Sequence, residues 1–172
     1  MPEDYIDRLL QKLVDANAPL DLEVEGIVDR IGHIHKRLRV ALKETLAEYG
    51  LTPEDWSVLT PLYLRSLGRS ASPGALARDL ELSSGAMTSR LDRLEQLGLV
   101  RRLPDPDDRR GVRIEITDAG REAWDAAAEV QGRKEAFFAS TLTKKEQQAL
   151  NALLRKLALA LEERTTREGR RR

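Results

Sequence analysis

Residues 83–98 read SSGAMTSRLDRLEQLG and predict one helix with both ends marked. Ser83 can cap the first turn, and Gly98 can end the helix in a left-handed conformation. At about 100° per residue, the bulky apolar side chains fall on one face of this helix. The residues predicted to form this inner face are Met87, Leu91, Leu94 and Leu97.

The opposite face of the same helix carries small and polar side chains, especially near its N-terminus. Such a face suits a helix that enters the major groove of DNA, about 12 Å wide, and bonds to base edges and phosphates. An ordinary solvated amphipathic helix is the alternative, because serine, threonine and glycine are common near helix caps. The candidate DNA-contacting residues of this helix are Ser83, Ser84, Gly85, Thr88, Ser89, Arg90 and Arg93.

A second, shorter helix is predicted over residues 72–82, SPGALARDLEL. Ser72 provides its cap and Pro73 stands at its first position, where proline is favoured. Its leucines can pack on the following helix. Because only two or three residues separate the two helices, we interpret the pair as a helix-turn-helix.

Downstream, residues 99–103 and 112–116 alternate as two short strands, and residues 104–111 form a turn rich in proline, aspartate and arginine. This hairpin is interpreted as a wing. An arginine at its tip can reach the narrow minor groove, where the negative potential is concentrated. We take Arg110 as that residue. A solvated charged turn is the alternative for an isolated run of this kind.

Four motifs occur in order along the chain: LTP at 51–53, LEQLGLV at 94–100, DPDDRRG at 105–111 and ITDAG at 116–120. Together they resemble the MarR family of winged helix-turn-helix transcriptional regulators, over roughly residues 27–161. The resemblance implies a homodimer on a pseudo-palindromic DNA operator, acting as a repressor released by a small ligand or by oxidation. On the wing it implies that Arg110 enters the minor groove and that Asp108 braces the hairpin. Arg109, between them, is a further candidate for DNA contact.

The remaining helical patterns predict the dimer. Apolar spacing indicates helices over residues 6–14 and 22–49, a third from Thr117 towards residue 140, and a last one that starts with a capping box at Thr143. The last helix has a leucine stripe that a small winged domain can hardly cover, so terminal helices of two chains are expected to interlock. An intrachain core can use some of the same leucines. The stripe comprises Leu150, Leu153, Leu154, Leu157 and Leu161.

The predicted fold class is therefore mainly α. A winged helix-turn-helix DNA-binding domain is expected over residues 51–117. It follows an N-terminal extension and dimerisation helix (1–50) and precedes C-terminal dimerisation helices with a basic tail (118–172).

Charge and composition narrow the function. The 172 residues include 29 basic and 29 acidic ones, a balance that on its own argues against nucleic acid. The basic residues gather in the wing and at 167–172, so the footprint on DNA can be local. The absence of cysteine excludes disulfides and thiol-based sensing. No apolar run approaches the roughly 20 residues of a membrane span, and the MPED start lacks a basic signal region, so a cytoplasmic protein is expected.

No motif indicates an enzyme. A phosphate-binding glycine loop, a nucleophile elbow and a His-Glu-x-x-His helix are all missing from the sequence. His33 and His35, the two histidines, lie about 200° apart on a helix and cannot easily share a metal. One is expected to line the dimer core or a ligand cleft, the other to be solvated. We expect no catalytic residue, no metal and no cofactor.

A protein-protein adaptor is the alternative function. In it, the charged hairpin would meet an acidic partner without specific DNA binding. Such an adaptor would show no steep, salt-dependent affinity for duplex DNA.

The effector follows only from a resemblance. Residues 84–94 and the extra N-terminal helix resemble the urate-responsive branch of the family, in which arginines matching Arg90 and Arg102 act in the switch. That branch has an aspartate after the tryptophan matching Trp56, where this chain has Ser57, and a tryptophan in its first helix, which this chain lacks. An anionic aromatic compound is therefore expected rather than urate itself. The alternative for Trp56 is that it is simply a core residue. The alternative for the protein is a regulator that binds no ligand. The candidate lining residues are His33, Arg37, Trp56, Ser57, Thr60 and Arg102.

Overall fold

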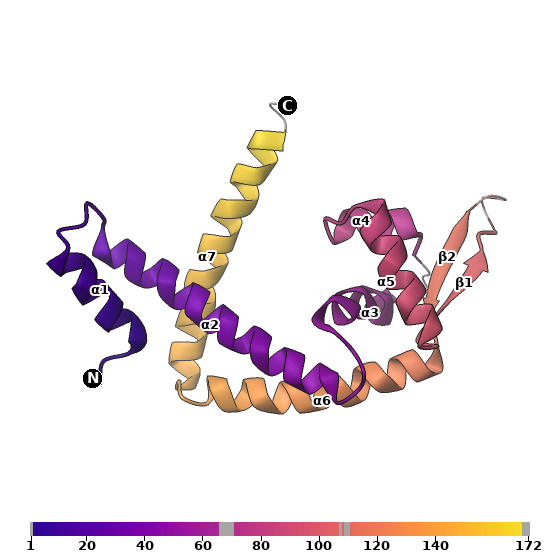
Figure 1. Ribbon diagram of the computed structural model, residues 1–172, viewed down its shortest axis with the longest axis horizontal. Helices are drawn as coiled ribbons and strands as arrows, with labels where there is room; N and C mark the ends of the chain where they lie inside the picture. Colours follow the sequence, from indigo (N-terminus) through magenta and orange to yellow (C-terminus); the bar gives the residue numbers. More distant parts are fainter. Residues whose placement is uncertain (1, 66–70, 107, 109–110, 170–172) are drawn as a thin grey trace. The chain divides into compact units, whose positions relative to one another are not determined.

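A computed structural model describes residues 2–65, 71–106, 108 and 111–169 (Figure 1). The chain divides into two compact units, residues 1–128 and 129–172. In the described part, the elements run in the order α1 (Tyr5–Asp15), α2 (Leu22–Ala47), α3 (Pro53–Arg65), α4 (Pro73–Asp79), α5 (Ser84–Gln96), β1 (Val100–Pro104), β2 (Val112–Ile116), α6 (Asp118–Ala139) and α7 (Lys144–Gly169). The mainly helical winged fold expected from the sequence is confirmed.

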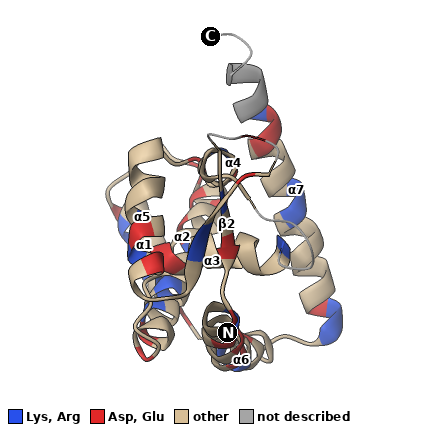
Figure 2. Cartoon of the chain, turned by 90° about the vertical axis from the view of Figure 1, so that its right-hand side faces the viewer, with Lys and Arg blue, Asp and Glu red and all other residues tan. Residues whose placement is uncertain are grey.

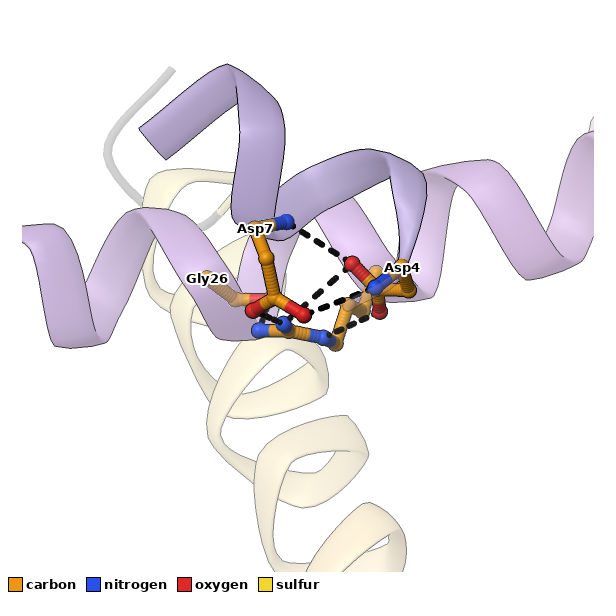
Figure 3. A network of polar contacts seen from close by, with 4 residues as sticks. Asp4, Asp7 and Gly26 are labelled. Atoms are coloured by element: carbon orange, nitrogen blue, oxygen red, sulfur yellow. Dashed lines mark hydrogen bonds and ion pairs between the residues drawn. The ribbon is translucent and has the colours of Figure 1, made fainter. Parts of the chain in front are cut away.

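Helix α1 is held on α2 by a polar network (Figure 3). Asp4 and Asp7 form a capping box at the start of α1, in which each side chain accepts the other's backbone N–H at 2.8 Å. Arg30 of α2 donates from Nε to Asp4 Oδ2 at 2.9 Å and also pairs with Asp7. One guanidinium therefore joins the N-terminus of α1 to α2.

We expect Arg30→Ala to release α1. The backbone N–H of Asp7 and the Arg30 guanidinium hold the pKa of Asp4 below its usual value. Because this folded-state pKa is depressed, the stabilisation is fully present above the usual aspartate pKa and is lost as the pH falls below that value and through the lower folded-state pKa. Protection of the α1 amides, measured relative to the intrinsic exchange rate at each pH, should therefore be lower in Arg30→Ala at neutral pH, and should fall in the wild type on acidification. Arg39→Ala, which removes a pair with Glu54 of α3, is the matched control; equal exchange in both variants would contradict the role of Arg30.

The winged lobe is built around a core shared by α2, α3, α4, α5 and the two strands. Local caps start its helices: the Thr52 hydroxyl accepts the Asp55 N–H at 3.1 Å, and the Ser72 hydroxyl accepts the Ala75 N–H at 3.2 Å. Apolar side chains from each element then fill the centre. Among those that are fully buried are Leu46, Val58, Leu59, Leu76, Met87, Leu91, Leu94 and Ile114.

The turn of the helix-turn-helix is longer than the sequence suggested. Helix α4 ends at Asp79, so four residues rather than two or three precede α5. The predicted continuation to Leu82 was wrong because Glu81 adopts a left-handed conformation with φ of +52°, which the helix cannot accommodate.

Helix α5 begins after Ser83, as predicted, and ends at Gln96, one residue before the predicted end at Leu97. Gly98, with φ of +72°, lets the Leu99 N–H reach the Leu94 carbonyl at 2.9 Å, while its own N–H bonds to the Glu95 carbonyl. This reversal buries Leu99 and leaves Leu97 44% exposed. The assignment of Leu97 to the inner face was therefore wrong.

The wing is an antiparallel pair in which Val100 lies opposite Ile116 and Leu103 opposite Arg113. Ala71 extends the pairing on the other edge of β2 through two backbone bonds with Ile114, of 2.8 and 3.3 Å. The hairpin is thereby fixed to the segment that precedes α4.

Helix α6 starts in the first unit and continues into the second, where α7 follows. The predicted capping box is present: Glu146 accepts the Thr143 N–H at 2.8 Å, and the Thr143 hydroxyl accepts the Glu146 N–H at 3.4 Å. Along α7 the leucine stripe is exposed, with Leu153 62% accessible. Each helix in the described ranges lacks the length or the apolar character that a membrane span requires.

Candidate nucleic-acid interface

The outer face of α5 presents hydroxyl groups and no bulky side chain over its first turns. The Ser83 hydroxyl accepts the Ala86 N–H at 3.2 Å, and the Thr88 hydroxyl donates to the Ser84 carbonyl at 2.9 Å. Gly85 and Ser89 are exposed beside them. Both bonded hydroxyls keep further hydrogen-bonding capacity, so this face can approach a polar surface closely.

Both arginines of α5 are directed to α3. Arg90 Nη1 lies 3.3 Å from Ser57 Oγ, and Arg93 Nε lies 3.0 Å from Asp55 Oδ2. These two residues of the predicted DNA-contacting set therefore also connect α5 to its neighbour in the lobe.

The arginines on the wing strands have carboxylate partners. Arg102 bonds to Asp92 and Glu95 of α5, and the bond to Asp92 is the main reason that the pKa of Arg102 is raised. Arg101 and Arg113 each lie 2.9 Å from a carboxylate, of Glu115 and Asp105 respectively. Figure 2 shows basic and acidic residues next to one another along β2. The expected basic stripe is thus interleaved with acidic groups over the described strands.

The turn of the wing is compact. The Gly111 N–H donates to the Asp108 carbonyl at 2.8 Å, and a Cβ at Gly111 would lie 2.8 Å from the Asp105 Cβ. Arg109 and Arg110 lie outside the described residues. Their DNA contacts, like the bracing role of the Asp108 side chain, stay predictions.

Three of the candidate effector residues lie together on α3. Trp56 stacks on Trp124 of α6, with ring centroids 5.2 Å apart and planes 3° apart. Thr60 Oγ1 accepts the Trp124 indole N–H at 3.1 Å, and Tyr63 stacks on the same indole at 3.8 Å. Ser57 follows Trp56 and accepts from Arg90. Trp56 therefore packs against the core of the lobe, and its stack joins α3 to α6.

The other effector candidates lie elsewhere in the chain. His33 is half-buried and stacks on Tyr5 of α1 with centroids 5.3 Å apart. It lies about 20 Å along α2 from Leu46, since an α-helix rises about 1.5 Å per residue. Arg37 is exposed on the same helix, and Arg102 lies on β1. A site that these residues share with Trp56 stays a prediction.

Two important residues escaped the sequence analysis. Asp55, buried to 1% exposure, is the partner of Arg93. The Thr52-x-x-Asp55 spacing of a capping box could have indicated it. Trp124 holds the aromatic stack, and its position on the expected helix after Thr117 was the available signal. Its partner across 68 positions could not be read from spacing.

The comparisons with known proteins agree with this geometry. The sequence model of the MarR family matches residues 51–112. The multiple antibiotic resistance protein MarR of Escherichia coli is 31% identical over 117 residues, covering 67% of this chain and 79% of that protein. The chain belongs to the MarR family. The HTH-type transcriptional regulator PecS of Dickeya dadantii is 29% identical over 149 residues, which cover 87% of this chain and 90% of PecS.

Solved MarR-family structures share the fold. A mutant MarR of E. coli complexed with operator DNA matches with a TM-score of 0.67 and 28% identity, over 78% of this chain and 95% of that one. Membership of this family of transcriptional regulators confirms the expectation that the protein is not an enzyme. Over the described residues, no cluster of three or more His, Cys, Asp or Glu side chains could hold a metal ion.

Proposed function

We propose that this MarR-family protein binds a pseudo-palindromic DNA operator as a homodimer and represses transcription there. The observation that carries the proposal is the exposed hydroxyl face of α5, whose helix is anchored to α3 and β1 by Arg93 and Arg102. A helix held in this way can place Ser84, Thr88 and Ser89 against base edges in the major groove. The wing, with Arg110 at its tip, would reach the adjacent minor groove.

Exposed apolar side chains on the terminal helices support the dimer. Several leucines of α7 are 40% exposed or more, Phe137 of α6 is 81% exposed, and Ile27 and Ile31 of α2 are also open to solvent. A monomer rarely leaves so many large apolar groups in water. We accordingly assign residues 1–50 and 118–172 to dimerisation and residues 51–117 to DNA binding. Two recognition helices would then lie about 34 Å apart, one turn of duplex.

A small anionic aromatic effector is the remaining part of the proposal. The dimer would bring α2, with His33 and Arg37, near a partner, and the Trp56–Trp124 stack joins the DNA-binding lobe to α6. A ligand that changed this junction would change the spacing of the two lobes and release the operator.

The proposal is tested by fluorescence anisotropy. A labelled duplex from the DNA upstream of the protein's own gene is compared with a scrambled duplex over a series of salt concentrations. A large preference for the native duplex, with affinity falling steeply as salt rises, is the expected result. Weak, equal binding to both duplexes would favour an operator elsewhere or the adaptor function.

Wing and recognition helix should respond differently to substitution. Arg110→Ala is expected to weaken binding to all duplexes, because a cation close to the phosphates of the minor groove is lost. The slope of log K against log salt concentration should decrease in magnitude by about 1. Ser89→Ala is expected to change the slope little and to reduce the preference for the native duplex, because base contacts carry specificity. Unchanged affinity in Arg110→Ala would disprove the assignment of the wing tip.

A further inference from the structure

We infer that Arg93 is a positioning residue, which orients α5 through Asp55 and the α2–α3 turn and does not neutralise a DNA phosphate. This role deepens the DNA binding proposed above and presupposes it. The residue lies on α5, the helix proposed to enter the major groove, where a cation would ordinarily be assigned to the phosphate backbone.

Asp55 is the anchor. Its side chain is 1% exposed, and a carboxyl group so deeply buried needs hydrogen-bonding or charged partners. Oδ2 accepts the Thr52 backbone N–H at 2.9 Å and the Arg93 Nε–H at 3.0 Å. The first bond belongs to the capping box that starts α3, so the carboxylate is fixed by its own helix. Arg93 therefore meets a rigid acceptor.

The Arg93 guanidinium also bonds to the backbone of the segment that precedes α3. Arg93 Nη2 donates to the Gly50 carbonyl, 3.2 Å away, in the segment that joins α2 to α3. A planar fork with two fixed acceptors holds both the position and the rotation of α5, which a flexible lysine could not reproduce. The side chain is 48% exposed, so it is near solvent while its donors are directed into the lobe.

The two possible roles of Arg93 predict opposite changes in DNA affinity when Asp55 is replaced. If Arg93 bound phosphate, removing the competing carboxylate would free the guanidinium and strengthen binding to DNA of any sequence. If Arg93 positions α5, the same change removes its anchor and weakens specific binding. Asp55→Asn is suited to this test because the asparagine amide has nearly the same shape and keeps an oxygen that can accept the Thr52 N–H.

The experiment measures specific and scrambled duplex binding against salt for Arg93→Gln, Arg93→Lys, Asp55→Asn and the double variant Asp55→Asn/Arg93→Gln. Arg133→Gln, shown by sedimentation velocity to remain dimeric, is the matched control, because it removes the same charge from an exposed pair with Glu129 on α6. We expect each single change at 55 or 93 to weaken specific binding on the order of tenfold, with the salt slope unchanged. The affinity of the double variant for the specific duplex should equal that of the weaker-binding single variant within about twofold, since the two residues act as one unit.

Two results would overturn the role: a salt slope reduced by about 1 in Arg93→Gln but kept in Arg93→Lys, or tighter binding in Asp55→Asn. Amide hydrogen exchange in the free protein tests the positioning role of Arg93 without DNA. Exchange in α5 should be faster in Arg93→Gln than in the wild type and in Arg133→Gln, and equal rates would also refute positioning. If the wild type bound no duplex specifically, the proposed function would fail while this exchange measurement still decided the role of Arg93.

Discussion

Gly120→Ala is expected to lower the free energy of unfolding by about 3 kcal/mol, which is large for the addition of one methyl group. A Cβ at this position would lie 2.1 Å from the Leu99 carbonyl oxygen and 2.8 Å from Ile116 Cγ1. The backbone around Gly120 cannot shift easily, because Thr117 is bonded to the two residues that precede β1. The Thr117 N–H donates to the Leu99 carbonyl at 3.0 Å, and the Thr117 hydroxyl donates to the Gly98 carbonyl at 2.7 Å. The start of α6 would therefore be forced away from the base of the wing.

Urea unfolding at one fixed protein concentration measures this effect, since the stability of a dimer depends on concentration. Gly85→Ala is the matched control. It adds the same methyl group in α5, where the new Cβ would meet no atom within 4 Å beyond its neighbouring residues and the helix's own backbone, and should leave stability unchanged or raise it by up to about 1 kcal/mol. Equal midpoints for the two variants would show that the contact at Leu99 is readily relieved.

Leu153→Glu combined with Leu157→Glu is expected to abolish the dimer and to weaken operator binding by about a hundredfold or more. Both side chains are exposed in the single chain, and burial of each leucine in an interface would contribute about 1.5–3 kcal/mol. Two carboxylates buried at the same place would be strongly unfavourable. A monomer also loses the advantage of binding two half-sites at once, which is typically worth a factor of about 10²–10⁴.

Sedimentation velocity and anisotropy on the native duplex report the two consequences separately. Gln148→Glu is the control, because it adds a carboxylate to α7 about 160° from the centre of the leucine stripe. It should leave both the mass and the affinity unchanged. A double leucine variant that remained dimeric would remove α7 from the interface, and a monomer with full affinity would refute the paired half-site arrangement.

Much of the helical framework could be predicted because its signals are local. The caps at Ser72, Ser83 and Thr143 and the stop at Gly98 each act on backbone groups within about four residues. The same holds for the wing, whose turn is bounded by two alternating strands. Glu81 and Leu97 were the exceptions, because one adopts an unusual φ and the other follows a reversal of the chain.

The candidate site divides along the same line. Its serines and threonine could be named from helical periodicity, which assigns residues to the outer face of α5. The direction of the arginines could not, because Arg93 pairs with Asp55 across 38 positions, and Arg102, expected at an effector site, pairs with Asp92 of α5. An arginine pairs with whichever carboxylate the tertiary packing brings close to it, and helical periodicity gives no information about that distance.

The sequence by itself determined the order of the helices, the helix-turn-helix, the wing and the hydroxyl face, since these depend on spacing and on caps within one or two turns. Only the tertiary structure decided that Trp124 stacks on Trp56 and Tyr63, that Gly120 must admit the Leu99 carbonyl and that Asp55 anchors α5. Those contacts join segments far apart in the chain. They exist only once the apolar core has brought the segments together, so no local pattern specifies them.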